Sequence, residues 1–313
     1  MIFSIIYYIF MKVCVIMSTY NGERYIKEQL DSIKNQKFNG EILIYIRDDG
    51  SRDRTVEYIE NYKKSNSLNI NINEGKNVGA SKSFMIAIND CPYADYYAFC
   101  DQDDIWIDDK ISTAVNDIGE TNKPILWCSN YSVVDANINV LKEFSLKKPR
   151  TNDLEALFYN NVPGCVMVFN NALMKEIRKI NINQVRMHDI VAINIAAITG
   201  KILYSNKICV LYRQHDQNVI GYGHKKIKFN KWIFQKIKLL KKGEPYSMSE
   251  YANQIIINFN QYLDERQRDE YMLISSANEN LLKRLKLLNK PYIDMKLGRT
   301  SLSIKCKLLF RLM

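Results

Sequence analysis

Two aspartates that lie two residues apart form a candidate cation site. Asp101 and Asp103 directly follow the apolar run Tyr96–Cys100 (YYAFC), which is typical of a buried β-strand. Two carboxylates just past a strand can hold one hard divalent cation, because Mg²⁺ and Mn²⁺ favour carboxylate oxygens and share their remaining positions with a diphosphate. A solvated acidic turn is the alternative, but the position between a buried strand and the apolar pair Ile105 and Trp106 favours the cation site.

Two more polar turns follow apolar runs earlier in the chain. Ser18–Glu23 follows residues 12–17, and Asp48–Ser51 follows residues 41–47. In a parallel sheet the carboxyl ends of the strands share one edge, and ligands bind in the crevice beyond it. We therefore expect both turns to converge with Asp101–Asp104 on one crevice. No GxGxxG follows the first run and no GxxxxGK[ST] occurs, so a dinucleotide dehydrogenase and a P-loop NTPase both lack their phosphate cradle.

The segments that must position these turns alternate between strand and helix patterns. We expect strands at residues 12–17, 41–47, 68–73, 96–100, 125–134 and 201–213, and a turn followed by a strand within 163–169. We expect helices at residues 23–36, 53–64, 81–90, 153–161 and 188–197. This alternation predicts an α/β fold, with a mostly parallel mixed sheet and helices on both faces.

The positive charge of the chain is concentrated in its last third. Of the formal net charge of +10, residues 225–313 contribute +11, with 19 basic and 8 acidic residues, and the first 224 residues contribute −1. This distribution argues against a uniformly cationic nucleic-acid binder, so no nucleic acid is expected as a partner. Residues 225–242 contain eight Lys, and their apolar residues fall on one helical face. Such a helix is typical of binding to an anionic membrane surface, although it could also pack on the rest of the protein.

The cysteines and the N-terminus each support one further expectation. The seven cysteines form no CxxC pair, which fits reduced, buried thiols in a cytosolic protein better than disulfides or a zinc site. Residues 1–10 are apolar but too short for a membrane span and lack the features of a signal peptide. We interpret residues 1–11 as an extension that precedes the first strand.

Seven short segments in order resemble a known family. MSTYNGERYI, IRDDGSRDRT, GKNVGASKSF and FCDQDDIW resemble the nucleotide-sugar domain of family 2 glycosyltransferases, which have the GT-A fold. VPGCVMVFN, MHDIVAINIAAITGKI and LYRQHDQNVIG resemble the bacterial rhamnosyltransferase branch of that family. The resemblance predicts a GT-A domain over residues 12–222 and a basic helical C-terminal region over residues 223–313.

The resemblance also implies a role for individual residues. The nucleotide-binding set would be Ser18, Thr19, Tyr20, Asp49, Lys76, Asn77 and Asp101, with Asp49 accepting a hydrogen bond from the base. The ligands of Mg²⁺ or Mn²⁺ would be Asp101, Asp103 and His215, with His215 supplied from the far side. The general base would be Asp189, and the acceptor side would include Trp106, Gly164 and His188.

Three of these residues have a purely structural alternative. Asp189 opens an apolar helix, so it could be only a helix cap. His215 could be a structural histidine instead of a metal ligand. Trp106 could stack on an acceptor sugar or pack in the core.

We therefore expect an inverting, metal-dependent glycosyltransferase in the cytoplasm, peripheral on the inner face of the plasma membrane. Its favoured donor is dTDP-L-rhamnose, on resemblance alone, and its acceptor is a lipid-linked or growing surface polysaccharide. A UDP-hexose donor is the main alternative. A nucleotidyltransferase would open with a Gly-rich basic loop, which STYNGER is not, and a non-enzymatic membrane module would not need Asp101, Asp103 and Asp189.

Overall fold

The computed structural model describes residues 11–144, 149–181, 187–215 and 247–293, together with Ile304, Lys305 and Leu308. Its strands are β1 (Lys12–Thr19), β2 (Glu41–Asp48), β3 (Asn69–Glu74), β4 (Tyr96–Cys100), β5 (Ile105–Trp106), β6 (Ile125–Val134), β7 (Val140–Phe144), β8 (Met167–Asn170) and β9 (Lys201–Arg213). Its helices are α2 (Ile26–Lys34), α3 (Thr55–Ser65), α4 (Ala80–Asp90), α5 (Lys110–Ile118), α6 (Asp153–Tyr159), α7 (Asn171–Ile177), α8 (His188–Thr199), α10 (Met248–Phe259), α11 (Glu265–Ser275) and α12 (Leu281–Leu288), with 3₁₀ turns η1 (Gly164–Val166) and η3 (Asn260–Tyr262).

The strands form one mixed sheet in the order β3-β2-β1-β4-β8-β6-β9-β5, with β7 paired to β6. The first four strands are mutually parallel, β8 runs antiparallel between β4 and β6, and β9 is parallel to β6. Residues Val13–Met17 of β1 are fully buried, which explains their continuous apolar run, because a central parallel strand is covered on both faces. The expected α/β class is confirmed, whereas β5, β7, α5 and α7 were not predicted.

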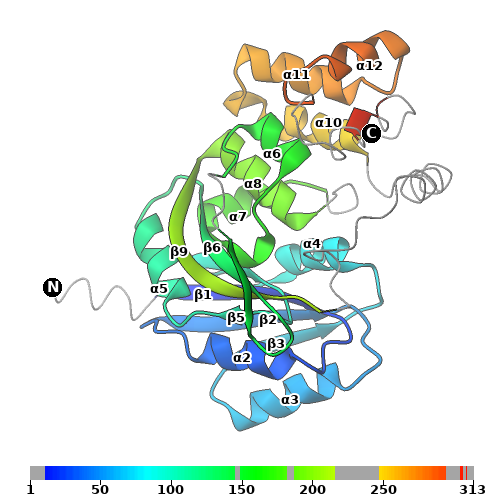
Figure 1. Cartoon of the computed structure of the whole chain (residues 1–313). Helices are drawn as coiled ribbons and strands as arrows, with labels where there is room; N and C mark the ends of the chain where they lie inside the picture. The colour runs from blue at the N-terminus through cyan, green and yellow to red at the C-terminus, as the bar shows by residue number, and fades with distance from the viewer. Residues whose placement is uncertain are drawn as a thin grey trace.

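Helices cover both faces of the parallel half of the sheet. Figure 1 shows α2 and α3 on one side of β1–β3, and α4 with α7 and α8 on the other. The side chains of α2 alternate between buried Ile26, Leu30 and Ile33 and an exposed polar face, as expected for a surface helix.

Helices α10 and α11 pack on α8, next to α6, and α12 packs on α11 (Figure 1). Asn194 of α8 donates to the hydroxyl of Tyr271 at 3.0 Å and accepts from that of Tyr251 at 2.8 Å, and all three side chains are buried. Residues 247–293 contain six basic and six acidic residues, so this packed part is electrically balanced. The predicted basic helix 225–242 and the apolar segment 1–10 lie outside the described residues. Within the described part of the chain, no helix is both long enough and apolar enough to cross a membrane.

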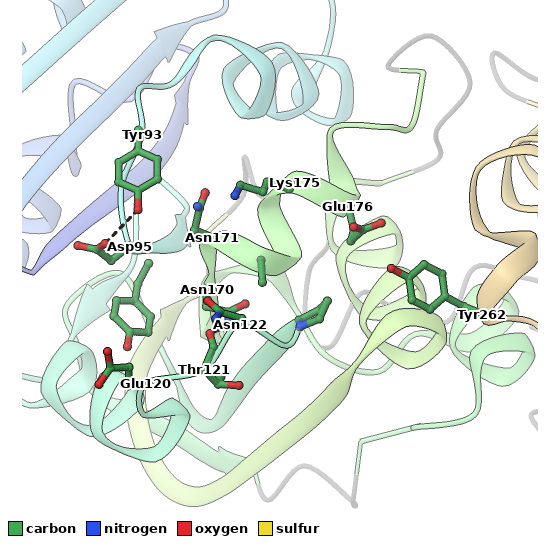
Figure 2. A pocket seen from close by; sticks show the side chains of 13 residues that line it. Tyr93, Asp95, Glu120, Thr121, Asn122, Asn170, Asn171, Lys175, Glu176 and Tyr262 are labelled. Carbon is green, nitrogen blue, oxygen red and sulfur yellow. Dashed lines mark hydrogen bonds between the residues drawn. The ribbon is translucent and has the colours of Figure 1, made fainter.

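The two edges of the sheet differ in their surroundings. At the carboxyl edge of β1, β2 and β4 lie the polar turns singled out in the sequence. At the opposite edge, where β4 begins and β8 ends, there is an open cavity of about 610 Å³, lined by polar side chains and tyrosines (Figure 2).

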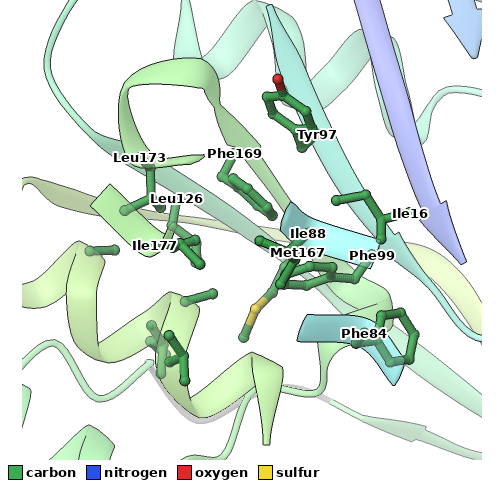
Figure 3. Close-up of a cluster of buried hydrophobic side chains, with 14 of the residues drawn as sticks. Ile16, Phe84, Ile88, Tyr97, Phe99, Leu126, Met167, Phe169, Leu173 and Ile177 are labelled. Carbon is green, nitrogen blue, oxygen red and sulfur yellow. The ribbon is translucent and has the colours of Figure 1, made fainter. Parts of the chain in front are cut away.

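A continuous core joins the two halves of the sheet across β4 and β8. The rings of Phe99 and Phe169 lie 5.0 Å apart and are fully buried, with Phe84 of α4 packed edge-on against Phe99 (Figure 3). The six described cysteines are all buried and free, which confirms the expectation of reduced, buried thiols for those six.

Candidate active site

Hydrogen bonds tie the polar turns after β1, β2 and β4 to one another. The side chain of Gln102 accepts from the backbone N–H of Tyr20 at 2.9 Å and donates to the Tyr20 carbonyl at 3.1 Å. Asn21 donates its backbone N–H to Ser51 Oγ at 2.9 Å and accepts from the Arg52 N–H at 2.8 Å. The three turns therefore meet at the carboxyl edge of the sheet, as predicted.

Ser18, Thr19 and Tyr20, which are predicted to bind the nucleotide, lie at the end of β1, the strand between β2 and β4. Ser18 Oγ lies 2.6 Å from Ser83 Oγ of α4, and Tyr20 is 44% exposed. Thr19 is buried and donates to Asp48 Oδ1 at 2.8 Å, so its side chain braces the turn from within. Of the three residues, Tyr20 has the most exposed side chain and Thr19 the least.

The Asp49 carboxylate is buried and has several partners within the protein. Its carboxylate is 2% exposed, pairs with Arg47 Nη1 at 2.6 Å and accepts from the backbone N–H groups of Val78 and Gly79. These three donors leave about one acceptor position of the carboxylate, so the hydrogen bond to a base stays a prediction. In this structure Asp49 fixes the Gly75–Gly79 loop to the end of β2.

Lys76 and Asn77 belong to that same loop and are exposed. The Lys76 carbonyl accepts from Arg47 Nη2 at 3.2 Å, which leaves the ammonium end of Lys76 to solvent. The buried Arg47 guanidinium, which the sequence analysis did not single out, therefore positions both predicted residues through the backbone of their loop.

The structure brings Asp103 and His215 together. His215 Nε2 lies 2.7 Å from Asp103 Oδ2, and both side chains are at most 15% exposed. The contact forms because β5 pairs with the end of β9, with Ile105 opposite Leu211. A residue just beyond β9 therefore reaches the acidic turn from its far side, as expected for His215.

Arg213 and Asp104 hold this turn in place. The backbone N–H of Arg213 donates to Asp104 Oδ1 at 3.0 Å, and its guanidinium donates to the carbonyls of Asp103 and Ala136, both at 2.8 Å. Arg213 is 1% exposed and also pairs with Glu28. Asp104 belongs to the polar turn that the sequence singled out, whereas Arg213 was not predicted, although an arginine at the end of a long apolar strand (ICVLYR) was a usable signal.

The electrostatics of the turn favour a bound cation. Burial, together with the nearby carboxylates of Asp103 and Asp189, raises the pKa of Asp101 to about 7. Oxygens of Asp101 and Asp104 and the sulfur of Cys165 lie within 4.8 Å of one another. The carboxylates of Asp101, Asp103 and Asp104 repel one another, and a bound cation would relieve this repulsion. Carboxylate oxygens fit the ligand preferences of Mn²⁺ or Mg²⁺, and the imidazole of His215 lies against Asp103.

A buried lysine lies beneath the acidic turn. Lys110 is fully buried, donates to the Cys165 carbonyl at 2.6 Å, and has its nitrogen 3.3 Å from the centroid of the Trp106 ring. Burial lowers the pKa of Lys110 to about 8. Trp106 itself is 1% exposed, so the packing alternative describes it, and the prediction that it stacks on an acceptor sugar does not hold in this structure.

Gly164, His188 and Asp189 lie together next to the acidic turn. The His188 ring stacks on Phe84 at 3.9 Å, and a Cβ on Gly164 would lie 2.5 Å from His188 Nε2. Among the described residues, neither ring nitrogen of His188 has a hydrogen-bond partner, and burial lowers its pKa to about 3, so the ring is neutral. Met187 occupies the N-cap of α8, and the Asp189 carboxylate in the first turn accepts from the backbone N–H of Ile190 at 2.7 Å, so Asp189 also stabilises the start of this helix.

Comparisons with known proteins agree with this geometry. The family model described as Glycosyl transferase family 2 matches residues 14–177, which include the turns after β1, β2 and β4. A dTDP-rhamnosyl transferase, RfbG of Shigella flexneri, is 34% identical over 216 residues, or 66% of this chain and 73% of that protein.

Solved structures agree on the fold. The crystal structure of S. aureus TarS 1-349 in complex with UDP-GlcNAc superimposes with a TM-score of 0.59 at 16% identity, covering 96% of this chain and 90% of that one. The mannosyltransferase PcManGT from Pyrobaculum calidifontis, in complex with GDP-Man and Mn²⁺, has a TM-score of 0.50 at 16% identity, covering 96% and 88%. The expected GT-A fold is therefore confirmed.

Proposed function

Because the chain belongs to glycosyl transferase family 2, we propose that it transfers L-rhamnose from dTDP-L-rhamnose to a lipid-linked or growing surface polysaccharide. The reaction would invert the anomeric configuration, since one acceptor hydroxyl displaces the diphosphate directly. The similarity to RfbG, a dTDP-rhamnosyl transferase, supports the choice of donor.

The observation that carries the proposal is the contact of Asp103 with His215 at the carboxyl edge of β4, where Asp101 also follows the strand. The contact of 2.7 Å between His215 Nε2 and Asp103 Oδ2 joins two segments 112 residues apart in sequence. Such a cluster would hold Mn²⁺ or Mg²⁺ between the protein and the donor diphosphate. When bound there, the cation supplies Lewis-acid stabilisation of the charge that develops on the leaving diphosphate.

The chain's own residues divide the remaining work. Arg213 and Asp104 keep the acidic turn in position, and the Gln102–Tyr20 contact holds the crevice next to it. Asp189 lies near enough to raise the pKa of Asp101, and it would take the proton from the attacking acceptor hydroxyl. Its place in the first turn of α8 favours the ionised carboxylate that this role requires.

The donor can be tested by calorimetry on the purified chain. We would titrate dTDP, UDP and GDP in the presence of Mn²⁺ or Mg²⁺ and repeat each titration with EDTA. We expect tight binding of dTDP that is lost with EDTA, and loss of this binding in Asp103→Asn but not in Asp108→Asn, an exposed acid in the same segment. Absence of nucleotide binding under all conditions would refute the proposal.

A UDP-hexose donor is the second candidate. The fold is shared with TarS, whose structure was solved with UDP-GlcNAc, and no described residue distinguishes thymine from uracil. A preference for UDP over dTDP in the same titrations would keep the glycosyl transfer and replace rhamnose by a hexose.

We also propose that the protein works at the inner face of the plasma membrane, where a lipid-linked acceptor is presented. Helix α12 supports this placement, because Leu281, Leu282 and Leu285 are 42–77% exposed beside the exposed Lys286. Sedimentation with vesicles of phosphatidylglycerol, against pure phosphatidylcholine, tests it. Binding to anionic vesicles that weakens in a Leu281→Ser/Leu282→Ser/Leu285→Ser variant would support α12 as the contact.

A further inference from the structure

A cavity of about 610 Å³ opens at the edge of the sheet opposite the candidate active site (Figure 2). We propose that this cavity binds a stretch of the neutral glycan that the enzyme extends, as a second site remote from the reacting end. The proposal rests on the proposed function, because it takes the product of that reaction as its ligand.

The cavity and the acidic turn lie at opposite ends of the same strand. Asp95 and Tyr96 line the cavity where β4 begins, and Asp101 follows Cys100 where β4 ends. At a rise of about 3.3 Å per residue, the two sites are roughly 17 Å apart along the strand. A single monosaccharide cannot span them, so the cavity would hold an earlier part of a chain whose end reacts elsewhere.

The floor of the cavity is fixed before any ligand binds. Asn170 is 4% exposed, and its side chain accepts from the N–H groups of Ile125 and Leu173 and donates to the Lys123 carbonyl. The Tyr96 hydroxyl donates to the Gly119 carbonyl at 3.0 Å. A floor held in this way loses little entropy when a ligand settles on it.

The rim carries two exposed aromatic rings with polar groups between them. Tyr93 is 64% exposed and Tyr262 is 42% exposed, and Figure 2 shows them at opposite sides of the cavity. Asn122, Asn171 and Lys175 lie between them (Figure 2). Amides offer both donors and acceptors, as sugar hydroxyls require, and the face of a tyrosine ring packs on the C–H groups of a sugar ring.

The charges of the lining select against other ligands. Asp95, Glu120 and Glu176 outnumber Lys175, so a nucleotide, a nucleic acid or an anionic lipid headgroup would be repelled. Pro124 and Ala172 are the only aliphatic side chains in the lining, so an apolar helix or lipid tail has little to bury against. These charges admit a neutral or a cationic ligand, and the amides and exposed tyrosine rings of the rim favour a neutral polyhydroxylated chain.

Binding of one chain at two places has a kinetic consequence. A glycan that is held in the cavity keeps its end at a high effective concentration near the active site, provided that it is long enough to reach. We therefore expect longer acceptors to be used more efficiently than short ones, with the gain residing in KM and not in kcat.

The test uses the full chain and an array of bacterial surface oligosaccharides that includes oligorhamnosides of two to six units. Ligands found on the array would be titrated by calorimetry against the wild type, a Tyr93→Ala/Tyr262→Ala variant and a Met272→Ala control, whose side chain is 44% exposed outside the cavity. We expect the double tyrosine variant to bind roughly tenfold more weakly, since two ring contacts are lost, and the control to bind as the wild type does.

Two results would overturn the proposal, and a parallel titration separates it from the proposed function. Either no glycan on the array binds, or binding is unchanged in the double tyrosine variant. A change in oligomeric state of that variant, seen by ultracentrifugation without loss of glycan binding, would make the cavity an interface between copies. Metal-dependent dTDP binding, measured on the same samples, reports on the active site alone, so its survival beside a failed glycan test would leave the proposed function standing.

Discussion

The turns that would bind the donor and the residues that would receive the acceptor are held by different forces. On the donor side, Gln102, Asn21 and Asp49 link separate loops through hydrogen bonds and one buried ion pair. On the acceptor side, the His188 ring is held by Phe84 and Phe99, and its two nitrogens find no hydrogen-bond partner among the described residues. Buried polar atoms without partners are costly, so the packing of this ring must offset a free-energy penalty that the donor side avoids.

This difference suggests a division of labour. The donor side is organised in advance by groups that satisfy one another, which suits a nucleotide that binds in one fixed position. On the acceptor side, the two ring nitrogens of His188, next to Asp189, have no hydrogen-bond partner among the described residues. Changes on the two sides should therefore separate binding from chemistry, and four predictions test this separation.

The largest effect is expected at Asp189. In Asp189→Asn the amide cannot accept the proton of the acceptor hydroxyl, so transfer should fall by about 10²–10⁴-fold. Binding of dTDP with Mn²⁺ should persist, since no proposed ligand of the cation or the nucleotide is changed and loss of the Asp189 charge only favours ionisation of Asp101. Product formation with a labelled donor and calorimetry of dTDP measure the two quantities. Near-normal transfer in this variant would reduce Asp189 to a residue that merely stabilises the start of α8.

A change at Asp103 should lower both the metal-dependent affinity for dTDP and the rate of transfer. Asp103→Asn weakens the cation site and breaks the contact with His215, so metal-dependent dTDP affinity should fall at least as far as the ~10- to 100-fold that loss of an outer-sphere partner costs a metal site. Transfer should fall with it. His215→Ala should lower the affinity in the same direction, and the double variant should add little, because both changes act on one ion. Fully additive losses would instead mean that the two residues bind independently.

The site residues that could be predicted from sequence are those whose position follows from local rules. Polar turns after apolar parallel strands must meet at one edge, and this rule located Asp101, Asp103 and the Ser18 turn correctly. The contact between His215 and Asp103 depends on antiparallel pairing of the two-residue strand β5 with β9, which no periodicity reveals. Only the family resemblance indicated it.

The residues that could not be predicted from the sequence are mainly buried charged side chains. Arg47, Lys110 and Arg213 are each at most 5% exposed, whereas charged side chains are by default interpreted as solvated. Their burial is explained only by tertiary partners, such as the Cys165 carbonyl for Lys110. The same reasoning explains why the partners of Asp49 were not predicted: Val78 and Gly79 lie on a loop whose course depends on the whole sheet.

Two glycines offer a matched pair of substitutions across the crevice. A Cβ on Gly164 would lie 2.5 Å from His188 Nε2, and the His188 ring is wedged between Phe84 and Phe99. Gly164→Ala should therefore destabilise the protein by about 1–3 kcal/mol. A Cβ on Gly22 would meet the end of the Gln102 side chain, which can turn away only by giving up its two hydrogen bonds to Tyr20. Because no buried ring has to move, Gly22→Ala should cost less than Gly164→Ala.

Denaturant unfolding of both variants, with His188→Ala added to each, measures this contrast. Removing the ring should relieve the Gly164→Ala variant relative to His188→Ala alone and leave the Gly22→Ala cost unchanged. An equal cost for the two glycines would contradict the view that ring packing holds the acceptor side while hydrogen-bonded side chains hold the donor side.

The smallest effect is expected in the pH dependence of stability. The pKa of Asp101 is raised from 3.8 to about 7 in the folded, metal-free protein, so the folded state binds more protons than the unfolded state between these values. Stability from this group should therefore rise as the pH falls through 7. His188 acts in the opposite sense below pH 6.5, because its pKa is lowered to about 3 and only the unfolded state takes up the proton.

The two contributions can be separated by subtraction. In EDTA, the stability of the wild type relative to Asp101→Asn should increase by about 2 kcal/mol between pH 8 and pH 5.5, and His188 cancels because both proteins contain it. Saturating Mn²⁺ should reverse the trend, since the cation favours the ionised carboxylate and competes with the proton. If the difference between the two proteins does not change with pH, Asp101 is already ionised without metal, and the electrostatic argument for a cation at the donor side loses its basis.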